Sequence, residues 1–225
     1  MTDSPEIPIV MTLAGNDPTG GAGLQADIEA ILSMGCHAAP VVTAVTVQDT
    51  ANVLGVTSVP AEFVIEQARA VLEDMPVAAF KIGLIGSVEN AEVIHSLLND
   101  YPRIPVILDP VLASGSGTEL AEDGLIEAML ELLVPIATVM TPNSLEAHRL
   151  APGSDTLEAC AMSLLDRGAE FVLVTGTHEG TPEVHNTLYG NHRRLETFTW
   201  PRLEGSFHGS GCTLASAIAA SMRSK

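Results

Sequence analysis

Short apolar runs rich in β-branched residues alternate with longer amphipathic stretches along this chain, and this alternation constrains its fold more than any other feature. Strands joined by helical crossovers lie parallel and are covered on both faces of their sheet. We therefore expect an α/β fold with a largely parallel central sheet and helices on both faces. The expected strands are 7–14, 41–47, 77–82, 106–108, 136–140 and 171–174, followed by an antiparallel pair at 184–188 and 195–199. The expected helices are 20–34, 61–73, 87–98, 122–134 and 157–165.

The length of the chain favours one domain. No Pro/Ser-rich linker or block of charge divides its 225 residues, and 46% of them are hydrophobic. A chain of this size and composition can bury one substantial core. We expect a single domain over residues 1–225.

Acidic residues dominate the charge of the chain. Its 28 acidic and 10 basic residues give a formal net charge of -18, which repels nucleic acid and anionic membrane surfaces. The lysines are only Lys81 and Lys225, so a bound phosphate would be held mainly by backbone amides, metal or arginine. Lys81 itself ends an expected strand, where a lysine side chain usually reaches toward the surface.

The cysteines and the N-terminal stretch indicate a reducing compartment. Cys36, Cys160 and Cys212 are an odd number of widely spaced cysteines, which argues against a disulfide framework. Residues 1–8 lack the pattern of a signal peptide, and no apolar run reaches the roughly 18 residues of a spanning helix. We expect a cytoplasmic protein.

The run 208–213 reads His-Gly-Ser-Gly-Cys-Thr and enters an apolar helical stretch. A helix N-terminus offers free amides and partial positive charge, so Gly209, Ser210 and Gly211 are expected to bind a phosphate or a developing oxyanion. Cys212 would lie in the first turn, where the helix dipole would lower the pKa of its thiol and let it act as a base. The alternative is a glycine-rich turn before a buried helix with an inert cysteine.

Polar residues follow several expected strands and should share one cleft, because ligands bind outside the carboxyl ends of parallel strands. Asp109 and Glu146 are placed to hold magnesium, directly or through water. Alternatively, Asn143 and Glu146 are only the capping box of a helix. Gln48 offers an amide that can donate to and accept from the edge of a heteroaromatic ring, or it simply starts a turn.

Residues 21–26, Gly-Ala-Gly-Leu-Gln-Ala, fit a dinucleotide-binding fingerprint, with Asp49 at roughly the required distance. That fingerprint needs its first glycine in the tight turn directly after the strand. Here six residues, Pro18 among them, separate Ala14 from Gly21. A nicotinamide oxidoreductase is therefore a minor alternative.

Taken together, several stretches resemble the hydroxymethylpyrimidine and phosphomethylpyrimidine kinases of thiamine biosynthesis, in the ribokinase-like superfamily. The resemblance runs nearly end to end and rests on six motifs in order: 14–27, 43–50, 81–84, 109–111, 141–143 and the Gly-Ser-Gly-Cys run. It implies a ribokinase-like three-layer sandwich. It also implies ATP-dependent phosphorylation of 4-amino-5-hydroxymethyl-2-methylpyrimidine and of its monophosphate, with ATP and Mg²⁺ as cofactors.

The resemblance also assigns roles to individual residues. Gln48 would bind the aminopyrimidine, and Asp27 would lie near the transferring phosphate. Asp109 and Glu146 would be the magnesium and phosphate acids, and Cys212 would stand where related sugar kinases carry an aspartate base. The other implied pyrimidine contacts are Gly15, Ala22, Val47, Leu84 and Val111. The implied nucleotide contacts are Asn143, Thr175 and Gly176.

Two departures from the family pattern shape the remaining expectations. Thr175 stands where the family often has a lysine, so a lysine contact to the ATP phosphates is absent there. The chain also ends close behind the Gly-Cys helix, and we expect it to lack the family's usual C-terminal helices. A helix burying a face of Leu214, Ile218 and Met222 would leave neighbouring sheet surface open, which favours a homodimer. The alternatives are a pyridoxal or pyridoxine kinase and a catalytically weak pyrimidine-binding remnant.

Overall fold

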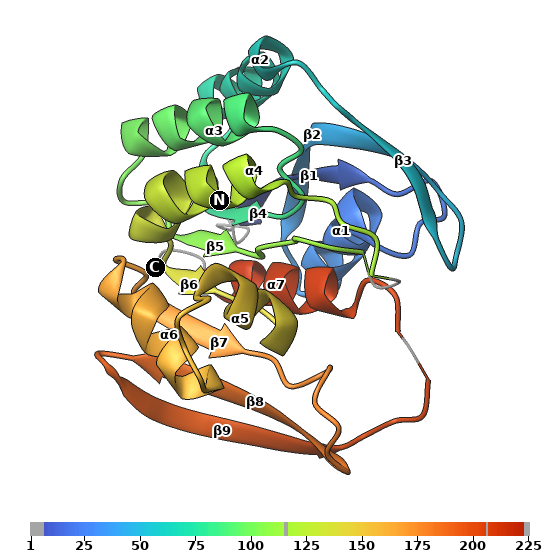
Figure 1. Cartoon of the computed structure of the whole chain (residues 1–225). Coiled ribbons are helices and arrows are strands. Elements are labelled where there is room, and N and C mark those ends of the chain that lie inside the picture. Colours follow the sequence, from blue (N-terminus) through green and yellow to red (C-terminus); the bar gives the residue numbers. More distant parts are fainter. Residues whose placement is uncertain (1–6, 115–116, 206, 223–225) are drawn as a thin grey trace, which may run out of the picture.

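The computed structural model describes residues 7–114, 117–205 and 207–222. A nine-stranded sheet runs through the molecule in the order β3-β2-β1-β4-β5-β6-β7-β8-β9 (Figure 1). Its strands are β1 (Ile9–Asn16), β2 (His37–Gln48), β3 (Val53–Ser58), β4 (Val77–Ile82), β5 (Val106–Leu108), β6 (Val139–Met140), β7 (Phe171–Val174), β8 (Glu183–Gly190) and β9 (Arg193–Pro201).

The six central strands β2, β1, β4, β5, β6 and β7 are parallel, and the sheet becomes antiparallel at both edges. At one edge β3 pairs with β2, and at the other β8 pairs with β7 and β9 with β8. The parallel strands therefore direct their carboxyl ends to one side of the molecule, where polar loops collect.

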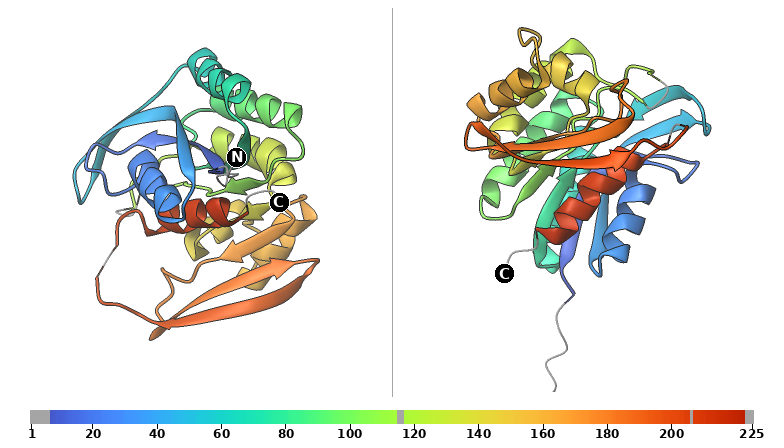
Figure 2. Two further views of the ribbon diagram at one scale, coloured as in Figure 1. Left: turned by 180° about the vertical axis from the view of Figure 1, so that it is seen from behind. Right: turned by 90° about the horizontal axis from the view of Figure 1, so that it is seen from below.

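Helices cover both faces of the sheet, as expected from the sequence (Figure 2). Their bounds are α1 (Gly23–Ser33), α2 (Ala61–Asp74), α3 (Val88–Asp100), α4 (Asp123–Ala128), α5 (Ser144–Leu150), α6 (Leu157–Asp166) and α7 (Ser210–Ser221). Residues of α2 to α6 share the larger buried cluster with the sheet, whereas α1 and α7 pack together on the opposite face. This arrangement matches the ribokinase-like three-layer expectation.

Most expected elements lie within two or three residues of their predicted bounds, but β3 was not predicted. β3 contains Gly55 and exposes Leu54, so it has neither the alternation nor the burial that identifies a strand in sequence. The expected helix 122–134 is also not continuous. α4 passes into a π-helical turn at 129–133 and a 3-10 turn at 134–136, because Pro135 cannot donate to the helical ladder.

The buried face of α7 differs from the expected one. Ala215, Ala219 and Ala220 are fully buried, whereas Ile218 and Met222 are only partly buried at the edge of this cluster. Small residues let α7 approach the sheet and α1 closely, so the alanine face is turned inward. The large side chains remain at the border of the packed surface.

Among the described residues, no helix combines the length and the apolar character needed to cross a bilayer. Cys36, Cys160 and Cys212 are free thiols.

Candidate active site

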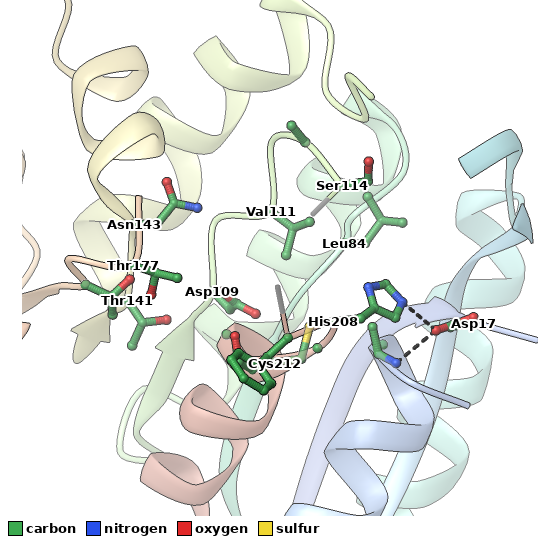
Figure 3. Close-up of a pocket in the computed structure, with 18 of the residues that line it drawn as sticks. Asp17, Leu84, Asp109, Val111, Ser114, Thr141, Asn143, Thr177, His208 and Cys212 are labelled. Atoms are coloured by element: carbon green, nitrogen blue, oxygen red, sulfur yellow. Dashed lines mark hydrogen bonds and ion pairs between the residues drawn. The ribbon is translucent and has the colours of Figure 1, made fainter. Parts of the chain in front are cut away.

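A cavity of about 730 Å³ lies at the carboxyl ends of the parallel strands, beside the N-terminus of α7 (Figure 3). It gathers segments far apart in the sequence: the ends of β1 and β2, the residues after β4 to β7, and the start of α7. The expected site residues that border it are Gly15, Ala22, Gln48, Leu84, Asp109, Val111, Asn143, Glu146, Thr175, Gly209, Ser210, Gly211 and Cys212. Three others, Asp27, Val47 and Gly176, do not border it.

The start of α7 has the form expected of an anion site. Gly209 precedes the helix with φ +75, and no side chain caps the helix. The amide of Ser210 donates to the carbonyl oxygen of Phe207 at 3.4 Å, so the amides of the following residues are those that the helix start leaves for an anion. A Cβ on Gly209 would overlap the carbonyl oxygen of Gly21. The loop before α7 therefore packs directly on the loop after β1, and glycine is required at this contact.

A second contact joins these two loops and was not expected from the sequence. His208 Nε2 lies 2.9 Å from Asp17 Oδ2, 191 residues away in the chain. Burial would raise the pKa of Asp17, but hydrogen bonds from Thr19, His208 and the amide of Ala22 lower it below its ordinary value. Asp17 is thus an ionised anchor that holds His208 at the cavity border (Figure 3).

Cys212 lies in the first turn of α7, as expected, but the expected lowering of its pKa is wrong. Burial raises the pKa of the thiol to about 12, and the negative charges of Asp109 and Asp27 act in the same direction, although Lys81 opposes them. Desolvation and two carboxylates outweigh the helix dipole. Cys212 is therefore a neutral thiol at neutral pH.

Asp109 and Glu146 border the same part of the cavity. Burial raises the pKa of Asp109, and the ion pair with Lys81 partly opposes this shift. For Glu146, burial and the nearby charge of Asp109 raise the pKa to about 8. Glu146 also completes the capping box of α5, because its Oε2 accepts from the amide of Asn143 and its own amide donates to Asn143 Oδ1. Glu146 therefore both caps α5 and borders the cavity.

These residues fit a magnesium ion by their chemistry. Asp109 Oδ2, Thr141 Oγ1 and Ser144 Oγ are buried oxygens without a hydrogen-bond partner. Within the described ranges, no three His, Cys, Asp or Glu side chains form a cluster that could hold a metal by themselves. Magnesium prefers oxygen ligands and keeps several waters, so two acids and nearby hydroxyls suit it better than a closed protein cage.

Lys81 and Asp27 form a buried ion pair, so two expectations need correction. The Lys81 side chain does not reach the surface: its exposure is 0%, and its Nζ lies 2.9 and 3.1 Å from the two oxygens of Asp27. Asp27 is also fully buried and lies behind the cavity rather than along it. A direct contact between Asp27 and a transferring phosphate would require the layer formed by Lys81 to open.

The expected pyrimidine pocket lies between β1, β2 and the loops after β4 and β5. Gln48 borders it at the end of β2, and Leu84 and Val111 supply apolar walls. Gly15 lies against Leu84, where a Cβ would approach Leu84 Cδ2 to 2.8 Å. Val47 is 62% exposed and points away, because successive side chains of a strand lie on opposite faces.

The expected nucleotide contacts lie at the ends of β6 and β7. Asn143 and Thr175 are joined by an isolated parallel bridge, and both border the cavity. Gly176 is held behind them by Asn186, which accepts from its amide, and by Arg202, which donates to its carbonyl oxygen. Arg202 also donates to the carbonyl oxygens of Thr177 and Thr181, so the guanidinium fixes this loop.

The dinucleotide fingerprint does not form its characteristic tight turn. β1 continues to Asn16, and α1 begins only at Gly23, so Gly21 lies in a longer loop between them. There it packs against His208, whose Cδ2 would be 2.7 Å from a Cβ on Gly21. This geometry does not support the nicotinamide alternative.

Comparison with known proteins gives one consistent family. A family model described as phosphomethylpyrimidine kinase matches residues 17–225. A hydroxymethylpyrimidine/phosphomethylpyrimidine kinase of Streptomyces coelicolor is 37% identical over 217 residues, which are 94% of this chain and 80% of that protein. A thiamine biosynthetic bifunctional enzyme of Arabidopsis thaliana is also 37% identical, over 96% of this chain and 43% of its own length. The chain thus spans less than half of that bifunctional relative.

Solved structures agree with the sequence comparison. A phosphomethylpyrimidine kinase of Clostridium difficile has a TM-score of 0.81 and 31% identity, covering 96% of this chain and 90% of that one. A pyridoxal kinase of Staphylococcus aureus in complex with AMP-PCP and pyridoxal has a TM-score of 0.86 and 27% identity, covering 96% and 80%. The similarity therefore extends to kinases of two different heteroaromatic alcohols.

Proposed function

Because the chain belongs to the phosphomethylpyrimidine kinase family, we propose that it transfers the γ-phosphoryl group of ATP to 4-amino-5-hydroxymethyl-2-methylpyrimidine and then to the resulting monophosphate. The product would be the pyrimidine diphosphate used to make thiamine diphosphate. The single nine-stranded sheet, whose edge strands are β3 and β9, supports a single kinase domain.

The observation that carries this proposal is the convergence of three kinds of group on one cavity. Gln48 offers a donor and an acceptor to a ring edge, the start of α7 offers backbone amides, and Asp109 offers a buried carboxylate oxygen that accepts no hydrogen bond and lies 3.6 Å from Lys81 Nζ. The amide of Gln48 suits an aromatic alcohol, the α7 amides suit a transferring phosphate, and the Asp109 carboxylate suits a cation. They come from segments more than 150 residues apart in the sequence, at positions 48 and 209–212.

In the proposed reaction, the hydroxymethyl oxygen forms a bond to the γ-phosphorus while the bond between this phosphorus and the bridging oxygen of ADP breaks. The amides of Gly209 to Gly211 would stabilise the charge on the transferring oxygens. Cys212 would accept the proton of the hydroxyl group, for which it must first lose its own proton to solvent. Phosphoryl transfer depends mainly on positioning and charge stabilisation, so a small ionised fraction suffices.

Magnesium and ATP complete the proposed site. Asp109 and Glu146 would hold Mg²⁺, which neutralises charge on the phosphates when bound. Asn143, Thr175 and Gly176 are proposed to contact the nucleotide, with Gly176 acting through its backbone. No lysine stands at 175, and Arg202 contributes indirectly, because its guanidinium donates to the carbonyl oxygens of Gly176 and Thr177 and so fixes the loop at this end of the cavity.

A coupled assay of ADP production tests the proposal. The chain is offered hydroxymethylpyrimidine, its monophosphate and pyridoxal as separate acceptors, with Mg²⁺–ATP in excess. We expect turnover with both pyrimidines. If the chain turns over neither pyrimidine but binds one of them in calorimetry, it would instead be a non-catalytic pyrimidine-binding protein.

Pyridoxal is the second candidate acceptor. The specific observation in its favour is the TM-score of 0.86 to the Staphylococcus aureus pyridoxal kinase in complex with AMP-PCP and pyridoxal. The 37% identity to a pyrimidine kinase against 27% to this pyridoxal kinase favours the pyrimidine. A higher kcat/KM for pyridoxal than for both pyrimidines would reverse this order.

We further propose a homodimer located in the cytoplasm. Exposed apolar side chains on β9, among them Phe198 and Trp200, support self-association. Three free thiols and the absence of a disulfide between them suit a reducing compartment.

A further inference from the structure

Behind the cavity, a connected row of buried polar side chains ends at Asp109. Thr12 Oγ1 donates to Asp27 Oδ2 at 2.6 Å, and Ser216 Oγ donates to Asp27 Oδ1 at 2.7 Å. Lys81 Nζ then lies against both oxygens of Asp27 and 3.6 Å from Asp109 Oδ2. The row thus links β1, α1, α7 and β4 to the cavity-facing acid at the end of β5.

The simplest role for the buried Lys81 is to neutralise Asp27. Two features of its surroundings indicate that it also acts on Asp109. Asp27 already accepts hydrogen bonds from two hydroxyl groups, and its ion pair uses only one side of the ammonium group. The other side of Nζ is directed toward Asp109, and Lys81 borders the cavity. Of the lysine and arginine side chains that border the described cavity, Lys81 is the one beside Asp109 and Cys212.

The position of the ammonium group is closely determined. A Cβ on Gly83 would lie 2.7 Å from Lys81 Nζ, so the backbone after β4 closes over the group. Asp109 is held on the neighbouring strand by its amide, which donates to the carbonyl oxygen of Ile82 at 2.8 Å. Lys81 and Asp109 therefore have little freedom to separate.

We infer that Lys81 is a positioning residue that holds the Asp109 carboxylate toward the cavity, and that Asp27, Thr12 and Ser216 serve to place Lys81. The inference rests on the proposed kinase function, in which Asp109 contacts the metal. It moves Asp27 from a direct contact with substrate to a supporting position behind Lys81. Lys81 acts through Asp109 and does not itself touch the transferring phosphate.

The test compares Asp27→Asn with Asp27→Asn/Lys81→Met. Removing Lys81 alone would leave a buried unpaired charge on Asp27, whereas the double variant removes both charges of the pair together. Asp27→Asn keeps the ammonium beside Asp109. We expect kcat to fall by roughly 10²-fold between these two variants, with the KM for pyrimidine changed less than about threefold, because Asp109 acts on the phosphate rather than on the ring.

A cycle with Asp109→Asn shows whether Lys81 acts through Asp109. In the Asp27→Asn/Asp109→Asn background, we expect Lys81→Met to lower kcat by less than about threefold, because residues that act as a unit are not additive. The matched control is Arg69→Met/Asp100→Asn, which removes an exposed ion pair and should leave kcat unchanged. A full 10²-fold loss in the Asp109→Asn background would overturn the inference and assign Lys81 a contact of its own.

A binding readout separates this inference from the kinase proposal. The Mg²⁺ dependence of AMP-PCP affinity, measured by calorimetry without turnover, should weaken about tenfold on going from Asp27→Asn to Asp27→Asn/Lys81→Met. An inactive wild-type chain would refute the kinase proposal, while this difference would still support the role of Lys81. If the double variant does not fold by near-ultraviolet circular dichroism, Asp27→Asn decides in two backgrounds: a loss of kcat that is as large in the Asp109→Asn background as in the wild type would show that Asp27 acts independently of Asp109 and overturn the inference.

Discussion

Cys212 combines a favourable position with an unfavourable protonation state. Its place in the first turn of α7 suits a proton acceptor, yet burial and two carboxylates raise the pKa of its thiol to about 12. A base with this pKa is mostly protonated at neutral pH. The ionised fraction then increases about tenfold for each pH unit between pH 7 and 9.

Replacing Cys212 tests this role. We expect Cys212→Ala to lower kcat by roughly 10²-fold, the usual contribution of a positioned base, and to leave pyrimidine affinity nearly intact. In the wild type, kcat should rise with pH from 7 to 9, and the variant should lose this rise. A wild-type profile that stays flat, or a variant that keeps most of its kcat, would remove Cys212 from the chemistry.

Gln48 is the polar group at the pyrimidine end of the cavity. Gln48→Leu keeps the size of the side chain but removes its donor and acceptor, which leaves the ring edge unpaired. Pyrimidine binding should weaken by about 1 to 3 kcal/mol, measured by calorimetry with hydroxymethylpyrimidine. Unchanged affinity would mean that Gln48 only begins the turn after β2.

The raised pKa of Glu146 should make the free energy of unfolding depend on pH. Its pKa rises from an ordinary value of 4.5 to about 8 in the folded chain, so between these pH values the folded state holds a proton that the unfolded state has released. Wild-type stability should therefore decline with rising pH by at most about 1.4 kcal/mol per pH unit from this group.

The Glu146→Gln variant is close in shape and does not titrate. Its free energy of unfolding, measured with urea at pH 5, 7 and 9, should increase relative to the wild type as pH rises and level off above about pH 8. A constant difference across this range would contradict a raised pKa for Glu146.

Individual site residues differ in how far the sequence reveals them. Asp109, Glu146 and Gln48 follow recognisable strands, so their convergence can be predicted from the rule that ligands bind at the carboxyl ends. The ion pair of Lys81 with Asp27 and the contact of His208 with Asp17 join residues 54 and 191 positions apart. Such pairs depend on how the helices, strands and loops pack, so neither the spacing nor the type of these residues predicts them.

The loop before α7 shows how one element depends on another. Gly209 has φ +75, and a Cβ there would also overlap the loop after β1. Gly35 is a matched control, because its φ is +78 and nothing lies within 4 Å of a Cβ. The two glycines separate backbone strain from steric overlap.

We expect Gly35→Ala to lower the free energy of unfolding by about 1 kcal/mol, the usual penalty for a left-handed non-glycine residue. Gly209→Ala should cost at least about 1 kcal/mol more, and it should also lower kcat by displacing the amides of α7. Urea denaturation and the ADP-production assay measure the two effects. Equal penalties at both positions would show that the α7 loop moves aside without harm.

The regular elements follow from local patterns, and the exceptions have local causes. β4, β5 and β7 have their predicted bounds, because each mainly apolar run ends at a glycine or a polar residue. β3 escapes prediction since it is an exposed edge strand, and the helix after α4 changes form before Pro135. The inward face of α7 is set by close packing on α1, which a hydrophobicity pattern alone does not reveal.

At the scale of the whole molecule, one face of β9 exposes apolar side chains beside the cavity. Phe198 and Trp200 stack at 6.0 Å and pair with Asn186 and Val184 of β8, on the face opposite α6. Phe198 is 43% exposed and Trp200 50%. α7 packs instead on β1, β4 and β5 (Figures 1 and 2). Apolar area of this kind usually marks an interface.

We therefore expect the chain to self-associate through this face of β9. Sedimentation velocity should show a dimer, and the dimer fraction should increase with salt, because a net charge of -18 on each chain opposes association at low ionic strength. Trp200 is the only tryptophan, so its fluorescence should shift to shorter wavelength as the protein concentration rises.

Phe198→Lys places a charge in the centre of this face and should shift the equilibrium to the monomer. The matched control is Leu54→Lys on β3, a residue 72% exposed at the opposite edge of the sheet, which should leave the dimer intact. Because Trp200 also borders the cavity, loss of the dimer should raise the KM for ATP more than the KM for pyrimidine. A monomer at all concentrations, with an ATP affinity independent of concentration, would show that this face of β9 is not a dimer interface.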